Sequence, residues 1–152
     1  FEAGEILLQF QKEKHNLKIT NKGTEGIASE ADEMSEMFIL SEIKSRYPEH
    51  MILSEEDYSH SQEKTFRSAK EADFCWVVDP LDGTSDFIDK TGEFTVMIAL
   101  IQNKKPILGV IAWPTEKTLF VAQKNCGAFR YSNDKWDKIS VTKIENLSKI
   151  KV

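Results

Sequence analysis

Cysteine and histidine are both scarce in this chain, which has two cysteines and three histidines among 152 residues. Cys75 and Cys126 are too few for a disulfide framework and lack the spacing of metal ligands, so both are expected to be free thiols. The histidines lie in polar stretches, far apart in the sequence. A zinc site or a histidine nucleophile therefore has little support.

Long apolar runs are absent too, and no charged-then-apolar segment opens the chain, so the sequence predicts neither a membrane span nor a secretory signal. Hydrophobic residues make up 40% of the chain and charged residues 30%, which is typical of a soluble domain, and we expect a cytoplasmic location. The net charge of -5 argues against a nucleic-acid polymer as partner. We expect a small-molecule partner, and the sequence does not indicate the oligomeric state.

Helical and strand patterns occupy different halves of the chain. Apolar residues at helical spacing predict one helix around residues 6–10 and a second from about Ala31 to Arg46. The polar interval 58–72 is expected to be a loop with a short helical turn. Later strands are expected at 94–102, 107–113, 118–123, 127–131 and 138–141, as an antiparallel meander. The order predicts an α+β fold with two main helices packed on a largely antiparallel sheet.

The segment 74–82 carries an apolar strand directly into two carboxylates, Asp79 and Asp82. Pro80 lacks a backbone donor and is expected to end the strand's hydrogen-bond ladder. Because the chain must turn there, both carboxylates and the Leu81 carbonyl can converge on one point, and Mg²⁺ prefers such oxygen ligands. An isolated motif of this kind is usually only an Asx-type turn, since Asp, Pro and Gly are ordinary turn residues.

The residues after this motif favour an anion. Gly83, Thr84 and Ser85 are expected to open a short helix, whose free N–H groups and positive dipole end would hold a phosphate.

A second acidic cluster, residues 54–57, follows another short apolar run at 51–53. Gathering carboxylates from two strand ends without a cation is unfavourable, so a divalent metal is predicted if these ends are neighbours. Glu55 is preferred over Glu56 and Asp57 as the ligand, because adjacent residues of an extended chain point in opposite directions.

Three segments, at 27–32, 52–57 and 76–101, resemble in content and order the Mg²⁺-dependent, lithium-sensitive phosphatases of the inositol monophosphatase superfamily. The words Leu-Ser-Glu-Glu-Asp, Asp-Pro-Leu-Asp-Gly-Thr and Gly-Glu-Phe-Thr-Val are most similar to those of the bacterial 3'(2'),5'-bisphosphate nucleotidases. The resemblance implies the N-terminal half of the sugar-phosphatase fold. Residues 1–152 would then form one metal-binding N-terminal domain, and we expect the C-terminal domain to be absent.

The resemblance also implies roles for individual residues. Asp32 and Thr84 would orient the attacking water. Ser29 or Asp32 could also simply cap the following helix, and the two roles of Asp32 are compatible. Lys22 could close over the site, although a solvated surface charge is the more ordinary assignment. The implied Mg²⁺ ligands are Glu55, Asp79, the Leu81 carbonyl and Asp82, and the implied substrate-binding residues are Gly83, Thr84, Ser85 and Glu55.

The implied activity is hydrolysis of the 3'-phosphate of adenosine 3',5'-bisphosphate, a small phosphorylated substrate. Ser85 and Asp89 depart from the lysines expected at these positions in the nucleotidases, which weakens the substrate assignment. Two alternatives therefore stay open. One is an inositol or sugar phosphate phosphatase, and the other is a truncated, non-catalytic domain that binds metal or phosphate.

Overall fold

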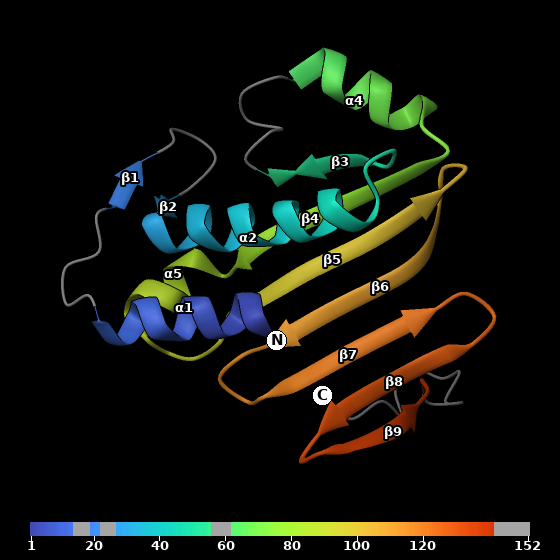
Figure 1. The fold of residues 1–152 in the computed structure, drawn as a ribbon. Coiled ribbons are helices and arrows are strands. Elements are labelled where there is room, and N and C mark those ends of the chain that lie inside the picture. Colours follow the sequence, from blue (N-terminus) through green and yellow to red (C-terminus); the bar gives the residue numbers. More distant parts are fainter. Residues whose placement is uncertain (14–18, 22–26, 56–61, 142–152) are drawn as a thin grey trace, which may run out of the picture.

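The structure, a computed structural model, describes residues 1–13, 19–21, 27–55 and 62–141. One seven-stranded sheet dominates this part of the chain, with strands in the order β3-β4-β5-β6-β7-β8-β9 (Figure 1). β3 and β4 pair in parallel, and every later pair is antiparallel. The strands are β3 Met51–Ser54, β4 Phe74–Asp82, β5 Thr95–Gln102, β6 Lys105–Trp113, β7 Thr118–Gln123, β8 Gly127–Ser132 and β9 Lys135–Ile139.

The two long helices, α1 (Glu2–Glu13) and α2 (Glu30–Arg46), pack against each other and on the sheet, α2 over β4 and α1 beside β5 (Figure 1). Acidic residues in the first turn of α2 and basic residues in its last turn complement the helix dipole. The predicted α+β architecture is therefore confirmed. None of the described helices is long and apolar enough to cross a membrane.

Smaller elements surround this layer. β1 (Ile19–Asn21) and β2 (Ile27–Ser29) form a short antiparallel pair, and α5 (Thr84–Asp89) follows β4. α4 (Gln62–Glu71) occupies most of the interval expected to be a loop, so that expectation was wrong. The reason is composition, because Gln, Glu, Lys, Arg and Ala are good helix formers even without an apolar stripe.

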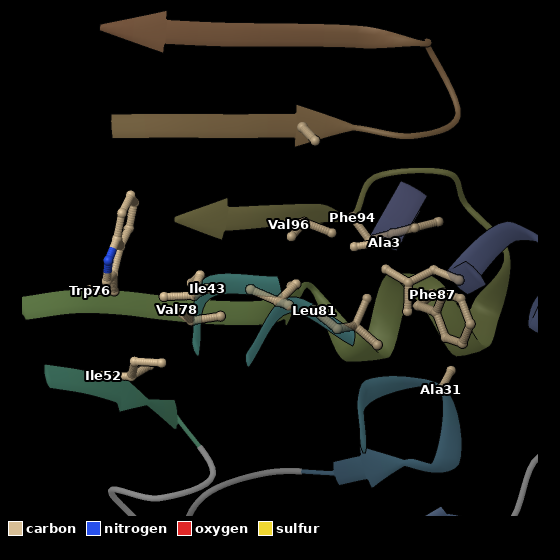
Figure 2. Close-up of a cluster of buried hydrophobic side chains, with 13 residues drawn as sticks. Ala3, Ala31, Ile43, Ile52, Trp76, Val78, Leu81, Phe87, Phe94 and Val96 are labelled. Atoms are coloured by element: carbon tan, nitrogen blue, oxygen red, sulfur yellow. The ribbon is translucent and has the colours of Figure 1, made fainter. Parts of the chain in front are cut away.

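The hydrophobic core lies between the helices and the sheet, close to the end of β4 (Figure 2). Val78, directly before the acidic motif, and Leu81, within it, are each 1% exposed, and the fully buried rings of Phe87 and Phe94 meet edge to face at 5.1 Å. Burying each such side chain stabilises the fold by about 1.5–3 kcal/mol. The acidic turn therefore lies against the buried core.

β4 runs through Pro80 to Asp82, contrary to the expectation that Pro80 ends the ladder. Regular pairing with β5 stops at Asp79, opposite Met97, and resumes at Asp82, opposite Thr95. Pro80 therefore lies in the irregular stretch of the strand, where its missing N–H is not needed for the ladder. The proline shifts the register instead of ending the strand.

The last strand begins three residues earlier than predicted, at Lys135 instead of 138. Asn133 and Asp134 both have positive φ, 50° and 58°, and form a two-residue hairpin turn. This tight turn brings Trp136 opposite Tyr131 in the β8–β9 pair.

The structure describes the surroundings of both cysteines and of His50. Cys75 is buried and Cys126 is exposed, and both are free, as predicted. His50, by contrast, does not lie in polar surroundings: its ring stacks on Tyr47 and Phe74, and its Nδ1 accepts a 3.0 Å hydrogen bond from Trp76 Nε1. This histidine is therefore part of a packed aromatic cluster.

Candidate metal and phosphate site

The carboxyl ends of β3 and β4 bring the two acidic segments together. The two strands are parallel, and Ser54 is paired with Val78, so Glu55 and Asp79 follow at neighbouring positions of the same sheet edge. The adjacency that the metal hypothesis required is therefore present. Glu56 and Asp57, like Lys22, lie outside the described residues.

Negative charge is crowded at Asp79. Its pKa is raised to about 6, first by burial and then by the negative charges of Glu55 and Asp82, with a hydrogen bond to Glu55 adding to the rise. The hydrogen bond from the Leu81 N–H acts in the opposite direction. These interactions place Glu55, Asp79 and Asp82 within electrostatic reach of one another, which is the arrangement that a bound cation would relieve.

Two hydrogen bonds hold the acidic turn together. The Leu81 N–H donates to Asp79 Oδ1 at 3.2 Å, and the Thr84 hydroxyl donates to the Leu81 carbonyl at 3.2 Å. Leu81 thereby connects Asp79 to Thr84. Its carbonyl oxygen keeps a second lone pair with which it could bind a cation.

The start of α5 has the backbone geometry expected of an anion cradle. Gly83 precedes the helix in the left-handed conformation, with φ 86° and ψ 42°, and no side chain caps this end. Thr84 is half-buried and Ser85 is exposed. The first N–H groups of the helix are therefore free of a side-chain cap, which favours a bound anion.

Asp32 lies in the first turn of α2 and is only 4% exposed. Three residues later on the same helix, the Ser35 hydroxyl donates to the Pro80 carbonyl at 3.1 Å. Residues three apart on a helix are neighbours on its surface, so Asp32 belongs to the part of α2 that meets the acidic turn. Sequence reasoning missed Ser35, because it is one of several serines on this helix and nothing in the local pattern distinguishes it.

The donors at this site are of the kind that Mg²⁺ prefers. In the described part of the chain, no group of three or more His, Cys, Asp or Glu side chains forms a ready-made metal cage. The available donors are instead the contacting carboxylates of Glu55 and Asp79, the nearby carboxylate of Asp82 and the Leu81 carbonyl. Mg²⁺ is usually bound by one or two carboxylates together with waters and substrate phosphate, so these residues fit it.

Comparisons with known proteins point to one family. The model of the inositol monophosphatase family matches residues 1–152. The chain is 35% identical over 126 residues to the Nus factor SuhB of Xylella fastidiosa, covering 83% of this chain and 42% of the relative. It is 31% identical over 140 residues to the 3'(2'),5'-bisphosphate nucleotidase CysQ of Haemophilus influenzae, covering 92% of this chain and 50% of the relative.

A solved structure of a relative is similar to this chain in fold and in sequence. The crystal structure of SuhB from Bartonella henselae superposes with a TM-score of 0.74 at 32% identity, covering 93% of this chain and 51% of that one. The chain thus spans about half the length of the relatives it matches.

Proposed function

The chain belongs to the inositol monophosphatase family, and on this premise we propose that it carries the metal and phosphate site of a Mg²⁺-dependent phosphomonoesterase acting on the 3'-phosphate of adenosine 3',5'-bisphosphate. The observation that supports this most directly is the crowding of Glu55, Asp79 and Asp82 around one acidic turn beside the start of α5.

The proposed ligands of Mg²⁺ are the carboxylates of Glu55, Asp79 and Asp82 and the carbonyl of Leu81. When bound, the ion would supply charge stabilisation of the phosphoryl group and acidify the attacking water. Glu55 and Ser85 are also proposed to contact the substrate.

The hydroxyl hydrogen of Thr84 has a defined direction. Because its hydroxyl hydrogen is directed to the Leu81 carbonyl, Oγ1 is left as an acceptor toward the attacking water. The Asp32 carboxylate is proposed to accept the second hydrogen of that water, and together the two acceptors would direct a water lone pair at phosphorus. The N–H groups of Gly83, Thr84 and Ser85 are proposed to bind the phosphoryl oxygens.

The similarity to CysQ supports the nucleotide substrate, and SuhB is a comparably close relative. An inositol or sugar phosphate is therefore the alternative substrate, favoured by Ser85 and Asp89 standing where the nucleotidase pattern has lysines. A non-catalytic domain that binds metal or phosphate is the third candidate, favoured by the half-length match. The exclusion of a nucleic-acid partner stays a prediction.

One assay separates the three candidates. Phosphate release is measured from adenosine 3',5'-bisphosphate, inositol 1-phosphate and fructose 1,6-bisphosphate, with and without Mg²⁺ and with Li⁺ added. We expect Mg²⁺-dependent, Li⁺-inhibited release that is fastest from the nucleotide. Faster release from either sugar phosphate would move the assignment to the alternative substrate, and Mg²⁺ binding without turnover would favour the non-catalytic domain.

Asp79 should make metal binding depend on pH. Its pKa is raised from 3.8 to about 6 in the folded chain, so without metal its contribution to stability is present below the ordinary pKa and is lost as the pH rises through about 6. Mg²⁺ requires the ionised carboxylate, so its stabilising effect should show the opposite trend. We expect the rise in Tm caused by Mg²⁺ to be large at about pH 7.5 and small at about pH 5, as measured by thermal denaturation. An equal rise at both values would remove Asp79 from the ligand set.

A further inference from the structure

Ser35 makes a buried hydrogen bond between elements that are distant in the sequence. Its side chain is 0% exposed, and its hydroxyl donates to the Pro80 carbonyl at 3.1 Å, 45 residues away along the chain. The bond joins the N-terminal half of α2 to the irregular stretch of β4 that separates Asp79 from Asp82. A hydroxyl placed there contacts the backbone between two of the proposed metal ligands.

The peptide unit between Pro80 and Leu81 is fixed at both of its polar ends. Its C=O accepts the hydrogen bond from Ser35, and its N–H donates to Asp79 Oδ1 at 3.2 Å. Because a peptide unit is planar, fixing the direction of the carbonyl also fixes the direction of the N–H. The Ser35 hydroxyl and the Asp79 carboxylate are thereby connected through one rigid group.

We propose that Ser35 is a positioning residue that orients the Asp79 carboxylate for a divalent cation, acting through the Pro80–Leu81 peptide. This inference rests on the proposed function, since it assumes that Asp79 is a metal ligand. A hydrogen bond accepted by the carbonyl polarises the same peptide and strengthens its N–H as a donor. That N–H holds Oδ1, and the Asp79 carboxylate also shares a hydrogen bond with Glu55.

The same bond also sets the position of α2 against the acidic turn. Asp32 precedes Ser35 by three residues, so both lie on one part of the helix surface. Ser35 would in this way hold the Asp32 carboxylate, which is proposed to orient the water, at a fixed position relative to the proposed metal ligands. No side chain in a long loop could do this as firmly, because α2 is anchored by the buried Ile39 and Ile43.

The test is the affinity for Mn²⁺, measured by electron paramagnetic resonance on the 152-residue chain, with Ser35→Ala as the variant. We expect Ser35→Ala to weaken Mn²⁺ binding about 10-fold, as is common when a group that orients a ligand is removed. Ser41→Ala is the matched control, because Ser41 lies on the same helix but is exposed and bonds only within it, to the Phe38 carbonyl at 2.8 Å. Its affinity should equal that of the wild type.

Ser35→Cys separates positioning from packing. A thiol is similar in shape and is a weaker donor than a hydroxyl, so the affinity should fall between those of the wild type and Ser35→Ala. A purely structural role would lower Tm in the variants yet leave Mn²⁺ affinity unchanged at temperatures well below Tm. Should Ser35→Ala fail to fold, the comparison of Ser35→Cys with Ser41→Ala decides the question.

The outcomes distinguish this inference from the proposed function. A wild-type chain that binds no Mn²⁺ would reject the metal site and this inference with it. A wild-type chain that binds Mn²⁺ as tightly as its Ser35 variants would reject the positioning role alone.

Discussion

Replacing Asp79 with asparagine is expected to stabilise the metal-free chain while weakening Mg²⁺ binding by about 100-fold or more, since a charged ligand is lost. The stabilisation follows from the raised pKa, because at neutral pH the Asp79 charge is disfavoured by burial and by Glu55 and Asp82. Asparagine keeps an oxygen that can accept the Leu81 N–H, and its amide can donate to Glu55. After allowance for solvent screening, we expect a gain of about 1 kcal/mol, or roughly 2–4 °C in Tm.

Thermal denaturation without metal and isothermal titration with Mg²⁺ measure the two effects. The control is Asp73→Asn, an exposed carboxylate just before the opposite end of β4, which should change neither quantity. A variant that loses stability without metal would show that the crowding at Asp79 is not unfavourable. Unchanged Mg²⁺ affinity would remove Asp79 from the proposed ligand set.

Gly83→Ala is expected to lower the free energy of unfolding by about 2–3 kcal/mol and to reduce affinity for inorganic phosphate sharply. Gly83 has φ +86°, which alanine adopts only with strain, and an added Cβ would lie 2.9 Å from the Glu93 carbonyl oxygen and 3.3 Å from Phe94 Cα. Both neighbours are backbone atoms, and Phe94 is fully buried, so neither can move aside easily. Relief of the clash would open the turn whose N–H groups are proposed to bind phosphate.

Urea denaturation measures the free energy of unfolding, and alanine variants of two other glycines serve as controls. Gly109→Ala should change stability by no more than about 0.5 kcal/mol, because nothing lies within 4 Å of the added Cβ. Gly92→Ala should fall between the two, since Gly92 has φ +88° but its nearest contact would be the Thr115 side chain at 3.6 Å. If Gly83→Ala is no more destabilising than Gly109→Ala, the turn is not constrained as the structure indicates.

Much of the architecture was predictable because it depends on local patterns. Apolar residues at helical spacing located α2 almost to its ends, and alternating strands with short polar turns indicated the meander from β5 to β8. The errors arose where a local rule had more than one structural outcome. Pro80 removes a donor whether the strand ends or shifts register, and pairing with β5 decided for the shift.

The candidate site divides in a similar way. Most of its residues lie within six positions of the chain, so a single turn brings them into contact and the motif could be recognised directly. These residues are Asp79, Leu81, Asp82, Gly83 and Thr84. The position of Glu55 beside Asp79 required the parallel pairing of β3 with β4, which was a hypothesis until the register was known. Ser35 could not have been found, because a serine in a helix shows its partner only after α2 packs on the sheet.

From the amino-acid order alone came the chemical identity of the site: clustered carboxylates, a Gly-Thr turn and an apolar strand that leads into them. These features follow from residues near one another in the chain, whose behaviour depends on local backbone geometry and charge. Folding in three dimensions decided which acids meet, how strongly their charges interact and which buried hydroxyl holds the turn. Those properties depend on burial and on contacts between distant segments, and neither exists until the helices have packed against the sheet.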